Sequence, residues 1–565
     1  MALNERAREA KMLENVRVVG QKIGDIHLYS HKTFETEPNG DAKSVFFLLG
    51  VAFLVLISAF VNYVNLTTSK ALDRAREIGM RKVVGSTQNQ IRTQIFTETV
   101  LMNLAAGLFA VLLVSIARPF FVEVAGLPEG FTAFGDLFFW QTLLGFLLLS
   151  ILVSGLYPAF VLSAFDPVKV LKGSFARSGH GVLLRKGLVV FQFTITVVLL
   201  VQTFAVFQQV NFLRDQNLGV EIDRTIVVKA PVEGEGDYGT FAQSLLAQSQ
   251  VEAVSVSGTV PGLGSIQMST STGINLSDAI EKNSNNFYIT QIDSSFLKLM
   301  GIKLLAGEDY DATSRPIFPN IEGNKRDVIV NEEAIRLWGI PTPEEAIGRE
   351  LDLGGNRVTI RGVVQNYHYE SPKSAYIPII HLYLPEFDNF ASVKFSGGNS
   401  SEQLATLKKV YKANFPYSPF SYFFLDSEYD KQYKADDRFQ TVFGVLTGFA
   451  ILISCLGLFG LATFTVSKRT KEIGIRKVIG ASTTNLMVLL SKDFVKTVLI
   501  SVVIGIPITY FLVENWLASY AARIELSWWL FAAPAALVLA LVIISISGKT
   551  IATALANPVD SLRSE

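Results

Sequence analysis

Cysteine and histidine are scarce in this sequence, whose 565 residues include one cysteine and five histidines. The single cysteine, Cys455, cannot form an intramolecular disulfide, and a metal cluster built from cysteines is excluded. Charged residues make up only 18% of the chain, against about 25% in soluble globular domains. Fifty basic and fifty acidic residues give no net charge, so composition offers no case for nucleic-acid binding.

Sequence motifs for catalysis and nucleotide binding are missing as well. Gly548, Lys549 and Thr550 invite comparison with a Walker A motif, but its first glycine would fall at Ile543, inside an apolar segment. Neither His-Glu-x-x-His nor Gly-x-Ser-x-Gly occurs. His368 stands between two tyrosines, where a packed or surface histidine is more common than a ligand. The sequence therefore predicts no catalytic, metal-binding or cofactor-binding residue.

Apolar residues are abundant, at 49% of the chain, and include 41 Phe. They gather in seven windows that contain no charged residue: 44–69, 99–117, 137–165, 187–213, 439–467, 497–513 and 526–548. A helix needs about 20 apolar residues to cross the hydrocarbon core of a membrane. The sequence therefore predicts an integral membrane protein of about seven spans, of which the sixth is marginal in length.

The Lys and Arg content of the short loops predicts on which side of the membrane each loop lies. Twenty Lys and Arg residues occupy one set of loops, 70–98, 166–186, 468–496 and 549–565. The short loops of opposite parity, 118–136 and 514–525, hold one each. The positive-inside rule places the first set in the cytoplasm. Residues 214–438 then form a domain outside, and the C-terminus is cytoplasmic.

The N-terminal segment fits this topology poorly. Residues 1–43 would lie outside, yet they lack the apolar stretch of a signal peptide, and their seven basic residues are balanced by seven acidic ones. Either the segment crosses the membrane without a signal or a span upstream of it is missing. We favour the second interpretation.

An internal repeat is the most informative feature of the chain. Residues 77–85 read Glu-Ile-Gly-Met-Arg-Lys-Val-Val-Gly, and residues 472–480 read Glu-Ile-Gly-Ile-Arg-Lys-Val-Ile-Gly, so that seven of nine positions are identical at an offset of 395. Two further spans follow each copy, and each unit ends on a Pro-Val tail, Pro167-Val168 or Pro558-Val559. Four predicted spans separate the two motifs, so both must face the same compartment.

Each motif is predicted to be a short amphipathic cytoplasmic helix. The apolar residues recur at i, i+3 and i+4: Met80, Val83 and Val84, then Ile475, Val478 and Ile479. In both copies a glutamate precedes an arginine by four residues, the order that favours an ion pair. The closing glycine can end the helix. Such an element can dock in a partner's groove. The alternative is that the basic residues only set topology and contact lipid headgroups, but this does not explain Glu-Ile-Gly or the glycine.

The Glu-Ile-Gly-x-Arg-Lys-Val-x-Gly core, followed by two spans and a Pro-Val tail, resembles the FtsX-like domain of MacB/FtsX-type ABC transporter permeases. The arrangement of two such domains resembles bacterial double-length permeases. In the outer domain, segments similar to the MacB-type periplasmic core domain are 296–310, 328–331, 346–348, 362–364 and 366–368. The resemblance implies an α-helical transmembrane domain in two FtsX-like repeats with an extracytoplasmic α+β domain.

The resemblance also implies domain boundaries. They are 1–43 for the remnant of a first extracytoplasmic domain, 44–172 for the first FtsX-like domain, 173–213 for a linker and the fourth span, 214–438 for the MacB-like core domain and 439–565 for the second FtsX-like domain. Members of the family have four spans per unit, and here the first unit has three. Residues 25–30, with Gly40 and Asp41, resemble the end of the family's first outer domain. An N-terminally shortened chain is implied.

In this family the first cytoplasmic loop docks on an ATPase subunit as a coupling helix. The resemblance carries that role to Glu77, Ile78, Gly79, Arg81, Lys82 and Gly85, and to Glu472, Ile473, Gly474, Arg476, Lys477 and Gly480. One double-length chain would then offer a docking site to each subunit of an ATPase dimer. No cofactor is implied for the chain itself.

The segment 214–438 reads as an α+β domain that is long enough for its own core. Strands are predicted at 225–229, 251–256, 287–292, 328–330, 358–364 and 391–395. Helices are predicted at 241–249, 294–300, 331–338 and 402–415. Polar helix patterns at 208–215 and 426–438 prolong two spans and predict either a stalk or solvated helix ends.

These observations predict the permease subunit of an ABC transporter in the bacterial inner membrane, which exports or extrudes a substrate with the help of a separate ATPase. A second hypothesis is mechanical signalling, in which the outer domain activates a periplasmic partner and nothing is transported. A third is a membrane-anchored enzyme whose outer domain is the catalytic head, which the missing catalytic motifs disfavour. The first two share every sequence feature described above.

Overall fold

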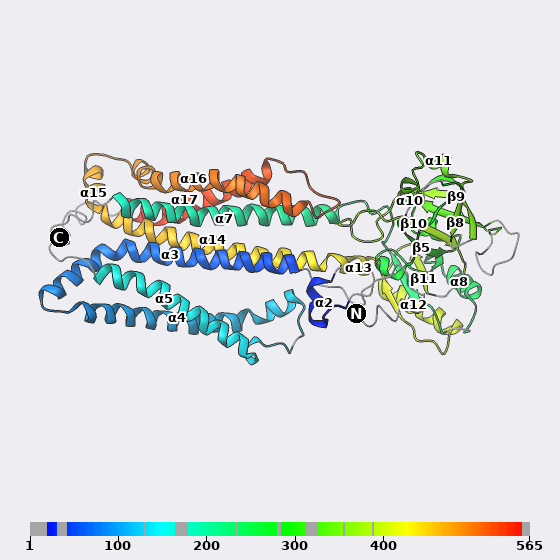
Figure 1. The fold of residues 1–565 in the computed structure, drawn as a ribbon, viewed down its shortest axis with the longest axis horizontal. Helices are drawn as coiled ribbons and strands as arrows, with labels where there is room; N and C mark the ends of the chain where they lie inside the picture. The colour runs from blue at the N-terminus through cyan, green and yellow to red at the C-terminus, as the bar shows by residue number, and fades with distance from the viewer. Residues whose placement is uncertain are drawn as a thin grey trace. The chain divides into compact units, whose positions relative to one another are not determined.

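The computed structural model describes residues 20–30, 42–128, 130–163, 179–232, 235–279, 284–311, 313–314, 316, 326–353, 356–386 and 389–555. The chain divides into two compact units, which we call the helical unit and the outer unit. The helical unit comprises Ser44–Val210, Asp436–Ser519 and Ile524–Glu565, and the outer unit comprises Met1–Lys43, Asn211–Ala435 and Tyr520–Arg523. The polar N-terminal pattern at 1–19 and both Pro-Val tails lie outside the described residues. Figure 1 labels the elements of each unit.

Long helices form the helical unit. Its elements are α3 (Ala42–Val83), α4 (Gln88–Ala125), α5 (Leu137–Ser163), α7 (Gly179–Arg214), α14 (Lys434–Lys468), α15 (Thr470–Val478), α16 (Thr483–Leu517) and α17 (Trp529–Leu555). Within the described residues, six helices are long and apolar enough to cross a membrane, and α5 contributes a shorter apolar stretch, Leu137–Leu152. The window predicted as a marginal sixth span belongs to α16, whose apolar part runs over Asn485–Leu517. The prediction of an α-helical membrane protein is confirmed.

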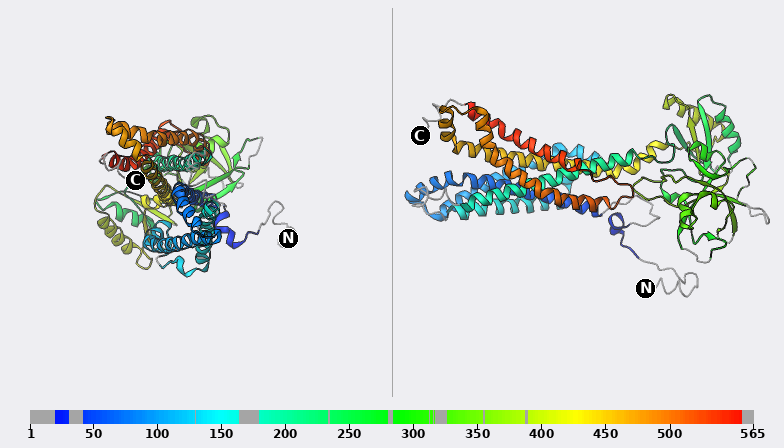
Figure 2. Two further views of the ribbon diagram at one scale, coloured as in Figure 1. Left: turned by 90° about the vertical axis from the view of Figure 1, so that its left-hand side faces the viewer. Right: turned by 90° about the horizontal axis from the view of Figure 1, so that it is seen from above.

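The last two helices of each repeat pack on opposite sides of a central group of helices. Helix α7 shares one core cluster with α14, α16 and α17, which includes Val197, Leu458, Val502 and Val542. Helices α3, α7 and α14 share another, which includes Val51, Leu199 and Phe443. Figures 1 and 2 show α16 and α17 on one side of α7, α14 and α3, and α4 with α5 on the other side. Helices α7 and α14 are therefore central in the unit.

In the described part of the outer unit, twelve strands form one mixed sheet. Ten of them follow the order β12-β1-β11-β2-β5-β10-β7-β9-β8-β4, while β3 pairs with β5 and β6 pairs with β9. The strands are β1 (Thr225–Lys229), β2 (Val251–Ser257), β3 (Ser269–Thr272), β4 (Asn275–Leu276), β5 (Asn286–Ile292), β6 (Leu304–Gly307), β7 (Asp327–Asn331), β8 (Glu350–Leu353), β9 (Asn356–Val364), β10 (Ile379–Tyr383), β11 (Phe390–Phe395) and β12 (Tyr422–Phe424).

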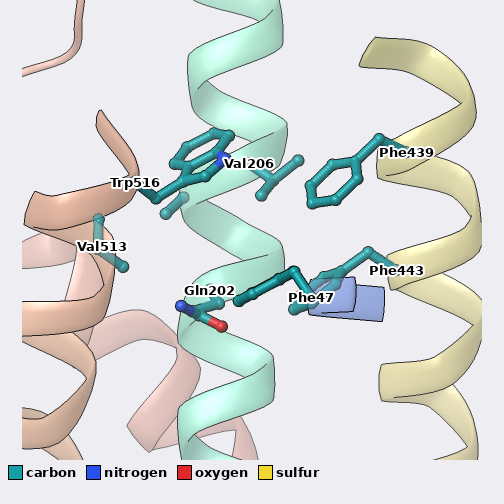
Figure 3. A pocket seen from close by; sticks show the side chains of 8 residues that line it. Phe47, Gln202, Val206, Phe439, Phe443, Val513 and Trp516 are labelled. Atoms are coloured by element: carbon teal, nitrogen blue, oxygen red, sulfur yellow. The ribbon is translucent and has the colours of Figure 1, made fainter. Parts of the chain in front are cut away.

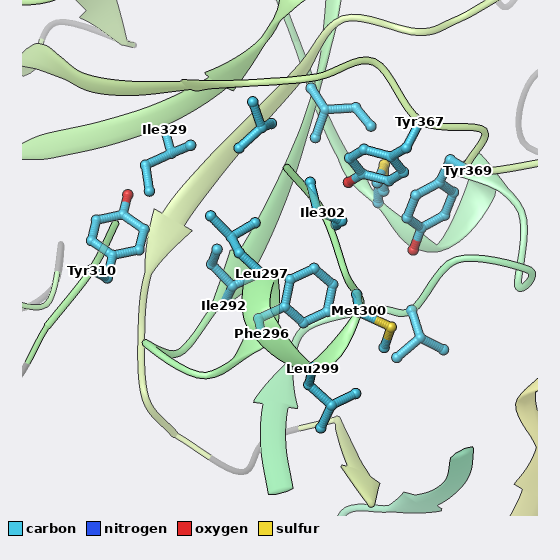
Figure 4. Packing of buried hydrophobic residues seen from close by; sticks show 14 of the residues in the cluster. Ile292, Phe296, Leu297, Leu299, Met300, Ile302, Tyr310, Ile329, Tyr367 and Tyr369 are labelled. Atoms are coloured by element: carbon cyan, nitrogen blue, oxygen red, sulfur yellow. The ribbon is translucent and has the colours of Figure 1, made fainter. Parts of the chain in front are cut away.

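Helices cover the two ends of this sheet. The longer ones are α8 (Tyr238–Leu246) and α12 (Ser400–Asn414), which pack on β1, β2 and β11. Short helices α10 (Glu332–Leu337) and α11 (Pro343–Ala346) pack on β7 and β9. A third cluster lies between them and includes α9 (Phe296–Leu299) together with Tyr367 and Tyr369 (Figure 4). Helix α2 (Ile23–Tyr29) contains most of the N-terminal segment that resembles the end of an outer domain.

The predicted elements of the outer unit are present, and several more were missed. All six predicted strands and all four predicted helices occur, with ends shifted by a few residues. The most central strand that was missed is β10, which pairs parallel with β5 and antiparallel with β7. Its five residues are all buried, so no alternation of polar and apolar residues reveals it. Pro378 and Pro385, on either side, read as loop residues.

Strand β10 carries a fully buried histidine, His381. Its Nδ1 lies 3.2 Å from the carbonyl oxygen of Ile329, so Nδ1 carries the proton and donates. Its Nε2 then accepts a hydrogen bond of 2.9 Å from the hydroxyl of Tyr367. Burial lowers the pKa of His381 to about 4. The ring is therefore neutral and satisfied on both nitrogens, as a structural residue would be.

This histidine predicts a loss of stability in mild acid. The unfolded chain takes up a proton near pH 6.5, whereas the folded chain resists protonation until about pH 4, so stability is lost as the pH falls through this window. The free energy of opening of the outer unit should be about 2 kcal/mol lower at pH 5 than at pH 7.5. Hydrogen exchange of the β7 and β10 amides in the full chain, corrected for intrinsic rates, measures this. An equal loss in a His381→Gln variant would contradict the assignment to His381.

Candidate functional site

The two repeated motifs differ in how they join the preceding helix. Both were predicted as short amphipathic helices. The second motif is one, since α15 follows α14 after a break at Arg469. The first is not, because α3 continues to Val83 without interruption, and this part of the prediction is wrong. The segment before the first motif has helix-forming Ala, Leu and Arg residues and no glycine or proline to end the helix.

Both motifs end in the same turn. Gly85 and Gly480 have φ angles of +105° and +96°, which side-chain-bearing residues rarely adopt. The amide of the next residue then donates back to the carbonyl of the motif arginine, over 2.9 Å from Ser86 to Arg81 and over 2.9 Å from Ala481 to Arg476. This six-residue bond is that of a Schellman motif. The predicted role of the glycines as helix ends is confirmed.

The following helices begin in the same way in both copies. Thr87 is the N-cap of α4 and forms a capping box with Gln90. Ser482, at the offset of 395, is the N-cap of α16 and accepts from the amide of Asn485. The signal for these caps is a Ser or Thr followed three residues later by Gln or Asn, which the sequence analysis did not use. The turn between motif and next helix is therefore specified by local chemistry.

Helix α15 has one face on the bundle and one face exposed. Ile473 is buried among Val466, Leu486 and Leu490. At roughly 100° per residue, the apolar stripe of Ile475, Val478 and Ile479 lies about 140–240° around the helix axis from Ile473. These three side chains are 50%, 64% and 79% exposed. Ile473 and Gly474, predicted as docking residues, are both buried and position the helix, while the stripe points away from the bundle.

The exposed stripe is flanked by a charged pair. Arg476 contacts Glu472 over 2.8 Å, which confirms the predicted ion pair in the second copy. In the first copy, Arg81 donates to the side chain of Gln94 on α4. Met80 and Val84 of the first stripe are 64% and 88% exposed. The side chains of Glu77, Ile78 and Lys82, and what surrounds Gly79, lie outside the described part of the chain.

Both motifs lie at one end of the helical unit. The C-terminal end of α3 and helix α15 both lie at the left-hand end of that unit in Figure 1. We call this the motif end. The N-terminal ends of α4, α7 and α16 lie at the same end, because successive long helices of the unit alternate in direction. Four long helices, α4, α5, α7 and α14, lie between the two motifs in the chain. Because this number is even, both exposed stripes lie at the motif end.

The outer unit holds the helix ends that connect to it. The hydroxyl of Tyr433 donates to the carbonyl of Leu213, the second-last residue of α7, over 3.5 Å. The guanidinium of Arg214 lies 3.9 Å from the carboxylate of Asp430 and 5.3 Å from the ring centre of Tyr433. The stretch from α13 (Leu425–Asp430) into α14 is helical throughout. These contacts join the end of α7 to the start of the α14 path.

The described part of the outer unit carries no group of side chains typical of a metal centre. Among the described residues, no group of three or more His, Cys, Asp or Glu side chains could hold a metal ion. His368 is half-buried, its ring centre lies 4.3 Å from that of Tyr376, and burial lowers its pKa. In the helical unit, a small pocket beside α7 is lined mostly by apolar side chains, including Phe47, Phe439 and Trp516 (Figure 3). The exposed stripes therefore remain the candidate site.

Comparison with known proteins gives a family match for both repeats. The family model described as "FtsX-like permease C-terminal" matches residues 49–167 and 444–555. The two matches begin 395 residues apart, at the offset of the repeated motif. A curated relative from Bacillus subtilis (strain 168), named "Uncharacterized ABC transporter permease YknZ", is 30% identical over 125 residues. That alignment covers 22% of this chain and 30% of the relative, so the chain spans less than a third of the relative's length.

Solved structures of outer domains were also found at low similarity. The periplasmic region of MacB from Actinobacillus actinomycetemcomitans is 15% identical at a TM-score of 0.26, covering 39% of this chain and 96% of that one. A domain of a putative permease from Porphyromonas gingivalis is 17% identical at 0.24, covering 35% and 88%. The extracellular domain of YknZ from Gram-positive bacteria is 13% identical at 0.24, covering 35% and 97%.

The closing turn generates a prediction. Replacing Gly480 or Gly85 by alanine forces a side chain into the left-handed region, at a cost of about 1–2 kcal/mol, although nothing lies within 4 Å of the new Cβ. Amide exchange over 470–486 or 75–90 should then accelerate about fivefold or more. Gly448→Ala is the control, since Gly448 is helical with open space around it. Equal exchange in all three variants would show that the turn does not need glycine.

Proposed function

Both repeats match the FtsX-like permease family model, and from that premise we propose that the chain is the permease subunit of an ABC transporter. In this proposal, a separate ABC-type ATPase dimer binds the motif end in the cytoplasm, and the outer unit lies on the periplasmic side of a bacterial inner membrane. The observation that carries the proposal is the pair of exposed apolar stripes at the motif end. Apolar side chains exposed together on one face of a helix are typical of a surface that binds a protein partner.

The geometry of α15 suits a docking helix. Buried Ile473 anchors it to α14 and α16, so its position is coupled to those helices. The exposed stripe supplies apolar area for a groove, and Arg476 beside it supplies a charge for the rim. Met80 and Val84 with Arg81 offer a similar surface on α3. Two such surfaces match the two subunits of an ATPase dimer.

Movement of the docked helices would reach the outer unit along continuous helices. Helix α14 joins the break before α15 at one end and the α13 segment at the other. Helix α7 packs on α14 through Thr203 and Thr447, whose hydroxyls are 2.7 Å apart, and through Thr196 and Ser454 at 2.8 Å. We propose that ATP-driven closure of the dimer moves these helices together and so moves the outer unit, for export or extrusion of a substrate.

Mechanical signalling is the second candidate, in which the outer unit activates a periplasmic partner and nothing is transported. The unbroken helical path from α13 through α14 favours it, since that path needs only to transmit force. Cargo or partner would bind the segment 214–438 in either case. A transport assay with reconstituted chain and ATPase separates the two.

Docking is tested by changes confined to the exposed stripe. Ile479→Ser removes apolar area without opening a cavity, and it should weaken binding of the ABC-type ATPase about tenfold. Arg476→Glu reverses a charge at the rim and should cost no less than about 2–5 kcal/mol of binding. The measurement is the affinity of the ATPase that copurifies with the wild-type chain for each variant in nanodiscs, together with its stimulated hydrolysis.

Matched controls lie at the motif end on another helix. Leu183→Ser changes a 72% exposed leucine near the start of α7, and Lys186→Glu reverses an exposed charge there. Both should leave ATPase binding unchanged. The proposal fails if no ABC-type ATPase copurifies, or if stripe variants and controls bind it equally well.

The orientation of the two units is tested by labelling single cysteines in a Cys455→Ser background. Tyr417 is 90% exposed in the outer unit, and Val84 is 88% exposed at the motif end. An impermeant maleimide added to spheroplasts should label Tyr417→Cys at once and Val84→Cys only after permeabilisation. Labelling of both in intact spheroplasts would sink the proposed topology.

A further inference from the structure

Three separate parts of the chain meet at one short segment of the outer unit. This segment, residues 368–374, lies between β9 and β10, and we call it the junction segment. Its Tyr369 is buried in the core cluster around α9 (Figure 4). The segment is therefore fixed to the core of the outer unit, and a displacement of its backbone is passed to that core.

The two segments that link the outer unit to α7 and α14 both contact the junction segment. After α7, the carbonyl of Leu218 accepts a hydrogen bond of 2.8 Å from the amide of His368. Before α14, the hydroxyl of Tyr429 donates to the carbonyl of His368 over 2.6 Å. The side-chain oxygen of Gln432 accepts from the amide of Ser371. Two connections to the helical unit thus end at the same place.

A third contact comes from the turn between α16 and α17. Residues Tyr520–Arg523, which we call the outer turn, belong to the outer unit, whereas the residues on either side belong to the helical unit. The amide of Ala521 donates to the carbonyl of Lys373 over 3.0 Å. The ammonium of Lys373 lies 5.1 Å from the ring centre of Tyr520, which is buried. Burial of the ring strengthens such a cation–π contact.

The outer turn is linked to α16 without slack. Helix α16 ends at Leu517, so Ala518 and Ser519 alone separate it from Tyr520. The amides of both residues donate back to carbonyls in the last turn of the helix, over 3.0 and 3.2 Å. A displacement of the end of α16 therefore displaces the outer turn with it.

The equivalent turn of the first repeat is attached elsewhere. Gly126, at the end of α4, lies 395 residues before Ala521. A Cβ at Gly126 would lie 2.1 Å from a guanidinium nitrogen of Arg438 on α14, so this turn packs on α14. The whole of the first turn belongs to the helical unit. The attachment to the junction segment is thus a property of the second repeat, which also holds α15.

The proposed docking helix α15 lies between α14 and α16 in the chain. Its buried Ile473 contacts Val466 of α14 and Leu486 of α16, so a displacement of α15 is passed to both helices. Helix α14 leads back to Tyr429 and Gln432, and α16 leads forward to the outer turn. Both routes from one docking helix therefore converge on the junction segment.

We propose that the outer turn is a third attachment of the outer unit, through which movement of α15 and α16 reaches the junction segment without passing through α7 or α14. Lys373 and Tyr520 are the positioning residues of this attachment. The inference rests on the proposed function, because the movement begins when an ATPase binds the α15 stripe. It adds to that function a second route from the same helix.

Amide exchange in the full chain in nanodiscs, without any ATPase, tests the attachment. Lys373→Met keeps the apolar stem and removes the ammonium, and Tyr520→Leu removes the ring. Each should raise exchange of Ala521 and of the junction segment about fivefold or more. Lys409→Met, at an exposed lysine on α12, is the matched control and should leave exchange at both places unchanged.

Transmission is tested with two flexible tetraglycine insertions, placed where the chain passes between the units. One follows Ser519 and slackens the link to α16, and the other follows Arg523 and slackens the link to α17. The contact residues are unchanged in both, so exchange without ATPase should stay at the wild-type value. When the copurifying ATPase is bound with a non-hydrolysable ATP analogue, exchange of the junction segment should change in the wild type. The insertion after Ser519 should remove most of this change, and the insertion after Arg523 should preserve it.

The outcomes separate this inference from the proposed function. Unaltered exchange in both Lys373→Met and Tyr520→Leu shows that the attachment is absent. A bound ATPase that leaves the wild-type junction segment unchanged, or an equal response in both insertions, shows that α16 does not carry the movement. Each of these results overturns the inference while the ATPase still binds the motif end. If no ATPase binds, the proposed function fails and the inference fails with it.

Discussion

The backbone of a chain within a bilayer must satisfy its hydrogen bonds internally, and this constraint shapes the helical unit. Each apolar segment therefore continues as one unbroken helix until it reaches a place where the chain can turn. Helix α3 turns at Gly85, whereas after α14 the chain breaks at Arg469 and turns at Gly480, at the end of α15. Both glycines have positive φ and are followed by a capped helix start. Because the turn follows the motif directly, the motif comes to lie at a helix end, where the exposed side chains are Met80, Val84, Ile475, Val478 and Ile479. Placement of the candidate site thus depends on the same turn that reverses the chain.

The two repeats share this turn and differ in what surrounds it. In the second, α15 is a separate helix held by Ile473. In the first, the motif prolongs α3. The repeats also differ where α3 meets α14, because Asn62 and Leu66 on α3 lie against Gly457 and Gly460 on α14.

The outer unit follows a different physical logic. Its sheet is stabilised by apolar clusters on strands and covering helices, with buried polar groups such as His381 satisfied on both nitrogens. Among its described residues, no group of three or more His, Cys, Asp or Glu side chains could hold a metal ion. Within this unit, Leu213 and Arg214 at the end of α7 contact Tyr433 and Asp430, which precede α14.

Sequence alone determined the membrane class, the repeat, the alternating charge of the loops and most elements of the outer unit, because these depend on composition and on short-range periodicity. It also identified the motif residues, since their identity at a fixed offset needs no coordinates. Only the tertiary structure showed that Ile473 and Gly474 are buried while Ile475, Val478 and Ile479 are exposed, because periodicity defines a helix face without saying what covers it. Strand β10 escaped prediction for a related reason. A segment buried on both faces has no polar alternation, and its partners, β5 and β7, are distant in sequence and are brought to it only by the folded sheet.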